Sequence, residues 1–270
     1  MICISFLEFL WRAGMKRLST NQWINSEFSH INFGDSRLKN RFFEVTKGLS
    51  EHSEKNIASS FDTWKDLKAC YRFFSNEKVE ASQILRPHQA KTIERVRQQK
   101  RVLFIQDTSV FSFGERPGST HLGLCSKHYS SKKPIRGLIL HSLLALSQKG
   151  IPLGIVNQKF IDRKGFKANG RLSKSQYQRL PIAEKESQRW LSFVEESKKL
   201  HTGGAQIIHM ADREGDIYEL YRDCLKWQED FIIRASHNRA INKKRRGRRQ
   251  MSGYSMFWKV AKLREFILLR

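Results

Sequence analysis

Two aspartates follow apolar runs that predict β-strands, and their side chains are the strongest candidates for chemistry in this chain. Asp107 follows the run 102–106, and Asp212 lies just beyond the run 206–210. Carboxylate oxygens are the ligands that a hard divalent cation such as Mg²⁺ prefers, and the end of a strand holds such a ligand rigidly. Two aspartates at one sheet edge repel each other unless a cation lies between them. The pair therefore predicts a divalent metal site.

The net charge indicates a polyanionic partner for that site. The 270 residues contain 50 Lys and Arg against 26 Asp and Glu, which gives a formal charge of +24, and each third of the chain is net positive. Lysine and arginine release counterions wherever they meet DNA phosphate, so nucleic acid fits this charge best. A soluble protein with a basic surface, or one associated with ribosomes, is the alternative. On DNA, two metal ions about 3.5 to 4 Å apart can promote an in-line phosphodiester displacement.

Each aspartate also has an ordinary structural explanation. Asp212 precedes a run with apolar residues at helical spacing, so the helix predicted over 214–226 would begin at or just after it, and an N-cap role alone would explain the residue. Asp107 begins the sequence Asp-Thr-Ser, which is common in turns. The combination is more specific, because the strands that precede the two residues would be neighbours in the sheet.

The first hundred residues have helical periodicity. Leu38, Phe42, Val45 and Leu49 recur at spacings of 4, 3 and 4, and Asp35 is placed to cap that helix. A second helix is predicted around 64–74, and a basic helix over 89–100. Residues 1–22 are an uncertain extension, and residues 23–100 are predicted to form an all-helical domain.

From residue 101 the periodicity changes to that of a sheet covered by helices. Three adjacent strands are predicted, then helix, strand, helix and strand, which is the beginning of a ribonuclease-H-like layered fold and makes the whole chain mixed α+β. A polar linker over 162–178 separates the two groups. The predicted segments are strands 102–106, 138–147 and 151–160, with a turn at 148–150, then helix 182–200, strand 206–210, helix 214–226 and strand 231–235.

Cysteines and hydropathy indicate a cytoplasmic protein. The four cysteines are far apart, lack a Cys-x-x-Cys pair, and therefore indicate reduced thiols. No run approaches the roughly 18 apolar residues that a membrane span requires, so no membrane partner is expected.

Several ordered motifs resemble one known family, the DDE transposases of the insertion-sequence IS-four family, and most closely its Tn-five-like cut-and-paste members. The likeness runs from about Trp23 to Arg239. Its motifs are Gly34-Asp35-Ser36-Arg37-Leu38, Ala69-Cys70-Tyr71-Arg72-Phe73-Phe74, Gln106-Asp107-Thr108, Arg136-Gly137-Leu138 with His141-Ser142, Pro152-Leu153-Gly154, Lys185-Glu186-Ser187 with Trp190, and Asp212-Arg213-Glu214 with Asp216-Ile217-Tyr218.

For the predicted sheet, the resemblance implies that Asp107 and Asp212 are the first two metal-binding aspartates of a transposase, with Mg²⁺, or alternatively Mn²⁺, as the cofactor. The activity implied is cleavage of DNA at transposon ends followed by strand transfer. A bacterial, nucleoid-associated location and a homodimer, or pairing with a full-length transposase on DNA, are implied as well.

For the helical region, the resemblance implies a domain that binds double-stranded transposon ends. Arg72 would contact the DNA, and Arg37, Lys39 and Arg41 are weaker candidates. A surface arginine between the core aromatics Tyr71 and Phe73 is the competing explanation for Arg72.

The chain departs from the family after residue 240. The family's third ligand is a Glu within Tyr-x2-Arg-x3-Glu-x6-Lys, and no such pattern follows Asp212. Residues 101–240 are therefore expected to be a partial catalytic core. Residues 241–270 would begin a β-rich insertion, with 256–260 as its first helix. We expect a truncated transposase that does not cut DNA alone.

Three other interpretations stay open. The chain could be a non-enzymatic DNA-binding protein that inhibits a full-length transposase. It could instead be a compact nuclease that borrows Glu214 or Asp216 as a third ligand, although on a helix Glu214 would point away from Asp212. Finally, the basic run 234–249 is either a phosphate-binding patch or a disordered surface loop.

Overall fold

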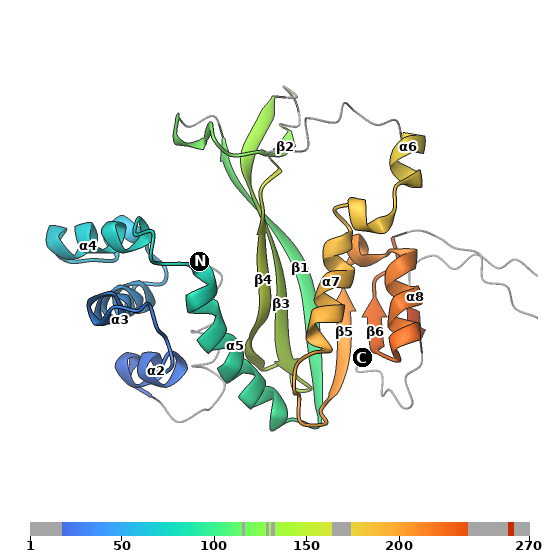
Figure 1. Ribbon diagram of the computed structural model, residues 1–270, viewed down its shortest axis with the longest axis horizontal. Coiled ribbons are helices and arrows are strands. Elements are labelled where there is room, and N and C mark those ends of the chain that lie inside the picture. The colour runs from blue at the N-terminus through green and yellow to red at the C-terminus, as the bar shows by residue number, and fades with distance from the viewer. Residues whose placement is uncertain are drawn as a thin grey trace, which may run out of the picture. The chain divides into compact units, whose positions relative to one another are not determined.

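The computed structural model of this chain is a mixed α+β protein with two compact units (Figure 1). It describes residues 18–114, 117–127, 130, 133–163, 174–236 and 259–261. One unit comprises Met1–Gln99 with Ala145–Ile155, and the other comprises Lys100–Leu144 with Val156–Arg270. None of the helices in the described part of the chain is long and apolar enough to cross a membrane.

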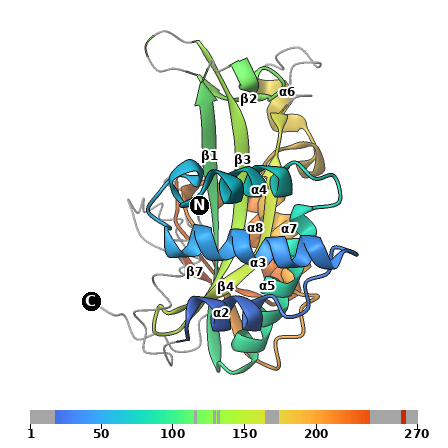
Figure 2. The same ribbon diagram turned by 90° about the vertical axis from the view of Figure 1, so that its left-hand side faces the viewer.

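The described residues before Lys100 form helices, as the periodicity predicted. The helix α3 lies between α2 and α4, and the two views agree on this order (Figures 1 and 2). The elements are α2 (Thr20–Glu27), α3 (Ser36–Glu51), the 3-10 turn η1 (Ile57–Ser59), α4 (Trp64–Phe74) and α5 (Ala81–Arg97).

Side chains that accept hydrogen bonds from free backbone amides begin three of these helices. The Asp35 carboxylate accepts from the Arg37 N–H at 2.8 Å, which confirms the predicted cap of α3. Ser19 and Gln22 form a capping box at the start of α2. The Thr63 hydroxyl accepts from the Asp66 N–H at 3.1 Å at the start of α4. Each cap satisfies a donor that the helix itself leaves unpaired.

An aromatic core joins α2, α3 and α4. Phe42 and Val45 on the predicted apolar face of α3 are buried, and Leu38 and Leu49 pack partly buried against the same core. Phe28 and Phe42 meet edge to face with ring centroids 4.9 Å apart. The buried members of this core are Ile24, Phe28, Ile31, Phe33, Phe42, Val45, Cys70 and Phe73.

A charged cluster fastens α5 within the same unit. Glu27 of α2, with 5% of its side chain exposed, pairs with the Arg95 guanidinium at 2.8 Å and with His88 Nδ1 at 2.6 Å. Arg95 Nε also donates to the Leu153 carbonyl at 2.5 Å, and the Ile155 N–H donates to His88 Nε2 at 2.9 Å. The helices of this unit are therefore bonded to its second segment, residues 145–155.

Glycine is required where α5 meets that second segment. Gly154 has φ +143, a backbone conformation that other residues rarely adopt. A Cβ atom at this position would lie 2.0 Å from the Thr92 hydroxyl oxygen. Gly154 thus lets the strand backbone approach α5 closely.

The second unit is built on a sheet of mixed strand directions. The strand order is β2-β3-β1-β5-β6-β7, and β4 pairs with β3. The strands are β1 (Arg101–Gly114), β2 (Leu124–Lys127), β3 (Pro134–Ser147), β4 (Pro152–Ile161), β5 (Gln206–Ala211), β6 (Asp230–Ile233) and β7 (Lys259–Ala261). The predicted strands and the hairpin turn before Ile151 are confirmed, although β1 continues eight residues past the predicted end at Gln106.

The predicted helix over 256–260 is wrong for the described residues. Lys259–Ala261 form β7, which pairs antiparallel with β6 so that Phe231 faces Ala261. The apolar pattern of this segment suits either structure, and pairing with the exposed edge of β6 decides between them. The remaining residues of 241–270 lie outside the described residues.

Helices of the second unit are shorter than predicted. The helix expected over 182–200 divides into the 3-10 turn η4 (Ile182–Glu184) and α7 (Gln188–Ser197). The helix expected from Glu214 begins only at α8 (Tyr218–Trp227), after the 3-10 turn η5 (Arg213–Gly215). Within the predicted linker, residues from 174 form α6 (Lys174–Arg179), and 164–173 lie outside the described residues.

The helices α7 and α8 lie beside β5 and β6 and share a core with them (Figure 1). Trp190 of α7 is 1% exposed, and its ring packs near Gly215, where a Cβ atom would lie 2.5 Å from the Ala211 side chain. The buried members of this core are Trp190, Leu191, Val194, Ala211, Leu220, Cys224, Phe231 and Ile233.

Candidate functional site

The strand register places Asp107 beside Asp212, at the level where β5 ends. The prediction that Asp107 also follows the end of a strand is wrong, because β1 continues to Gly114. The strands β1 and β5 are parallel neighbours, and Gln106 faces Ala211 across them. The residues that follow this pair, Asp107 and Asp212, are both exposed. The predicted adjacency of the two strands is therefore confirmed. The role of the two carboxylates as metal ligands stays a prediction.

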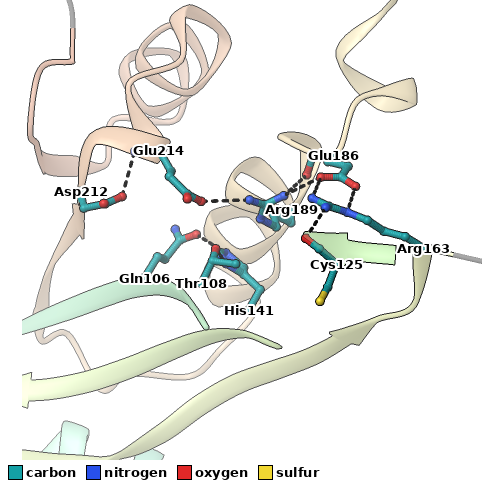
Figure 3. A network of polar contacts seen from close by, with 9 residues as sticks. All are labelled: Gln106, Thr108, Cys125, His141, Arg163, Glu186, Arg189, Asp212 and Glu214. Atoms are coloured by element: carbon teal, nitrogen blue, oxygen red, sulfur yellow. Dashed lines mark hydrogen bonds and ion pairs between the residues drawn. The ribbon is translucent and has the colours of Figure 1, made fainter. Parts of the chain in front are cut away.

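The Asp212 carboxylate caps a turn. It accepts a hydrogen bond from the Glu214 N–H at 2.9 Å and so begins η5, as Figure 3 shows. The expectation that Asp212 lies at the start of the long helix is wrong, because α8 begins six residues later at Tyr218. The capping explanation thus holds for the turn, and one carboxylate oxygen, Oδ2, remains outside this bond.

A buried histidine holds the residues on both sides of Asp107. His141 of β3 lies 3.1 Å from Gln106 Oε1 through Nε2 and 2.9 Å from the Thr108 hydroxyl through Nδ1 (Figure 3). Its ring packs against Trp190 with centroids 4.7 Å apart. Burial, together with the nearby charge of Arg189, lowers the His141 pKa to about 3, so the imidazole is neutral near pH 7.

His141 therefore fixes β1 on both sides of Asp107. The Gln106 carbonyl oxygen can only accept, so Nε2 carries the proton and Nδ1 accepts from Thr108. In the sequence, His141 stands out only as part of the motif that includes His141-Ser142, which predicts no role for it. The bonding partners lie 33 and 35 residues away, so no local pattern could have identified them.

A chain of ion pairs lies next to this site (Figure 3). Arg189 of α7, 12% exposed, contacts Glu214 at 3.1 Å and Glu186 at 3.8 Å. Glu186 also accepts from Nε and Nη2 of Arg163, and Nη1 of that guanidinium donates to the Cys125 carbonyl at 3.0 Å. The network ties the turn after Asp212 to α7 and to the end of β4.

These contacts disfavour Glu214 and Asp216 as a third metal ligand. The Glu214 carboxylate points toward Arg189 (Figure 3). Asp216, 8% exposed, accepts from the Tyr221 hydroxyl at 2.7 Å and from the Ser236 N–H at 2.6 Å. Across the described ranges, no group of three or more His, Cys, Asp or Glu side chains could hold a metal ion. Among the described residues, the predicted metal site therefore has two carboxylates, those of Asp107 and Asp212.

The predicted DNA contacts lie on two neighbouring helices of the first unit. Arg37, Lys39 and Arg41 are on α3, where Arg37 is exposed and the other two are partly exposed. Arg72 is exposed on α4. The competing explanation for Arg72 is wrong in one respect, because Tyr71 is 46% exposed, although Phe73 is a core residue at 2%.

The face of α4 around Arg72 combines aromatic and basic side chains. Trp64, Lys68, Tyr71 and Arg72 recur at spacings of 4, 3 and 1, which places them on one side of a helix, and all four are exposed. Trp64 is 71% exposed. Trp64 and Lys68 were not among the predicted DNA contacts, although their helical spacing from Arg72 could have indicated both. We call these four residues the α4 face.

Comparisons with known proteins bear on this helical segment. Residues 20–79 match the family model for transposase DNA-binding domains. The match spans α2 to α4 and indicates a DNA-binding role related to transposition. Among solved structures, the chain is similar to the piggyBac transposase in a synaptic complex with hairpin DNA, at 14% identity and a TM-score of 0.36. The similarity covers 92% of this chain and 51% of that chain, so this chain spans about half the length of its neighbour.

Proposed function

We propose that this protein binds double-stranded DNA at transposon ends through residues 20–79. The observation that carries the proposal is the exposed α4 face, which lies inside the segment that matches transposase DNA-binding domains. Arginine and lysine bind phosphates and fix a protein on the duplex, whereas aromatic side chains contact sugars and bases. Trp64, with 71% exposure, and Tyr71, with 46%, give this face two aromatic rings that are accessible to a partner.

Arg72→Ala is expected to lower the affinity for DNA about tenfold and to reduce the slope of log affinity against log salt by about 1. The reason is the loss of one phosphate contact. The measurement is fluorescence anisotropy over a series of NaCl concentrations, with a duplex that the unmodified protein has enriched from a random pool.

Arg86→Ala is the matched control, because Arg86 is an exposed arginine on α5 outside the matched segment. It removes the same charge from the same unit. Equal losses in the two variants would show that only net charge matters and would contradict a specific role for Arg72.

We further propose that the sheet of the second unit derives from a ribonuclease-H-like DDE core. The strand register that makes Asp107 and Asp212 neighbours supports this ancestry. When Mg²⁺ or Mn²⁺ is bound between such carboxylates, it can activate a nucleophile for phosphodiester cleavage. The described residues supply two ligands, so the proposal for this chain is limited to cation binding. A DNA-binding protein that inhibits a full-length transposase is the non-enzymatic alternative.

Asp107→Asn and Asp212→Asn are each expected to weaken Mn²⁺ binding by at least about tenfold, since each removes one of two charges that attract the ion. Electron paramagnetic resonance of free Mn²⁺ measures the bound fraction without requiring DNA cleavage. Asp62→Asn, at an exposed position before α4, is the control. Unchanged binding in both sheet variants would exclude this pair as the cation site.

A further inference from the structure

The strand register places a third charged residue beside Asp107 and Asp212, at the level where β5 and β6 end. The strands β5 and β6 are parallel, and Ala211 faces Ile233. Arg234 follows Ile233 just as Asp212 follows Ala211, and the Arg234 N–H donates to the Ala211 carbonyl at 3.0 Å. With Asp107 on β1, three charged residues therefore stand level on three adjacent strands. Strand spacing places the Arg234 backbone roughly 5 Å from that of Asp212 and 10 Å from that of Asp107.

Arg234 combines its place beside Asp212 with an unpaired guanidinium, a state that it shares with Arg179 and Arg213 among the described residues of this unit. Its side chain is exposed, and within the described part of the chain no group accepts a hydrogen bond or ion pair from it. Arg189, by contrast, lies between two glutamates, and Arg222 pairs with Asp223 at 2.6 Å. Arg234 is thus free to bind an anion that approaches the sheet edge.

The chain on both sides of Arg234 is held in place. Before it, β6 pairs with β5 up to Ile233. After it, the Ser236 N–H and hydroxyl donate to Asp216 Oδ2 at 2.6 and 2.9 Å. The Tyr221 hydroxyl bonds the other oxygen of the same carboxylate. Asp216 therefore anchors the segment that carries Arg234 to the loop that follows Asp212.

We propose that Arg234 binds a phosphate of the DNA strand that lies at this edge, beside Asp107 and Asp212, and that Asp216 positions it. The inference rests on the proposed function, since it needs DNA to be the partner. Two exposed carboxylates repel a phosphate, and a cation in the same row offsets that repulsion. A guanidinium suits the task because its planar donors bind two phosphate oxygens at once.

The test compares Arg234→Ala, Arg234→Lys and Arg222→Ala on the duplex that the unmodified protein enriches from a random pool. Arg234→Ala is expected to weaken binding about tenfold and to reduce the salt slope by about 1. Arg234→Lys keeps the slope but loses part of the affinity, because lysine cannot bind in a bidentate manner. Arg222→Ala, which removes an equal charge from a paired arginine, is expected to change neither by more than about twofold.

Replacing single phosphates of the duplex by neutral methylphosphonates locates the contact. Neutralising one phosphate, or two adjacent ones, should lower the DNA affinity of the unmodified protein and of Arg222→Ala. The affinity of Arg234→Ala should not change. Asp216→Ala should lose part of this position-specific response, because Ser236 is no longer held. Arg234→Gln removes the charge but keeps the first three side-chain carbons and a polar end, and it replaces the alanine variant if circular dichroism shows that alanine destabilises the fold.

The outcomes separate the two proposals. If the unmodified protein enriches no duplex, or if Arg72→Ala binds as tightly as the unmodified protein, the proposed function fails. If binding depends on Arg72 but Arg234→Ala matches Arg222→Ala in affinity, salt slope and methylphosphonate response, only the role of Arg234 is overturned.

Discussion

Glu27→Ala is expected to destabilise the first unit by about 3 to 5 kcal/mol, because it leaves a charged guanidinium without its buried partner. Glu27 is 5% exposed and accepts hydrogen bonds from both terminal nitrogens of Arg95. The Ile155 N–H occupies His88 Nε2, so Nδ1 carries the proton that His88 donates to Glu27. No other carboxylate among the described residues pairs with Arg95.

Hydrogen exchange of the backbone amides in α2 and α5 gives this free energy for the unit itself. Glu44→Ala removes an exposed carboxylate from α3 and is expected to change the same amides by less than about 0.5 kcal/mol. If the two variants exchange alike, the cluster contributes little to stability.

The same cluster makes the stability of the first unit depend on pH in acid. Burial alone would raise the Glu27 pKa, but the hydrogen bonds and charges of Arg95 and His88 outweigh it and lower the pKa from 4.5 to about 2. A lowered carboxyl pKa contributes stability that is complete above pH 4.5 and is lost as the pH falls toward 2. The full loss amounts to about 3 kcal/mol.

Acidification from pH 6.5 to 4.5 is expected to cost the second unit about 2 kcal/mol through His141. Burial and the charge of Arg189 lower its pKa from 6.5 to about 3, so the unfolded chain binds a proton throughout this interval and the folded chain does not. Stability is complete above pH 6.5 and falls as the pH decreases toward 3. Glu27 contributes only below about pH 4.5, which separates the two effects.

Hydrogen exchange of β1 and β3 amides at a series of pH values measures this slope. His141→Gln, which removes the titrating group, is expected to flatten it even if the variant is less stable throughout. His121→Gln, at an exposed position, should leave the slope as it is in the unmodified protein. A slope that survives His141→Gln would assign the acid sensitivity to another group.

Local patterns predicted the parts of the fold that local energetics decide. Asp35 was identified as a cap because a cap needs only its own first turn. The pairing of β1 with β5 followed from the order of strands and helices, which leaves few ways to arrange a sheet covered by helices. The neighbouring positions of Asp107 and Asp212 were therefore accessible from the sequence.

Features that depend on distant partners were not accessible. The apolar spacing after Asp212 fits a helix, yet η5 and an extended Ile217 precede α8, since Asp216 is buried to bond Ser236, 20 residues later. The Arg95 pair with Glu27 spans 68 residues. Arg234, which lies beside Asp212, belongs to the basic run 234–249. The composition of that run predicts either a phosphate patch or a loop and does not single out Arg234.

The hydrogen bonds of α5 limit which segment of this protein could be transferred to another protein. A gene fusion that transferred only residues 18–99 would leave behind Leu153 and Ile155, whose backbone groups bond Arg95 and His88. It would also discard Gly154, where a side chain would clash with Thr92. Fusing the helical segment to a new protein thus requires residues 145–155 as well. The transferable unit consists of two segments that are separated in the sequence.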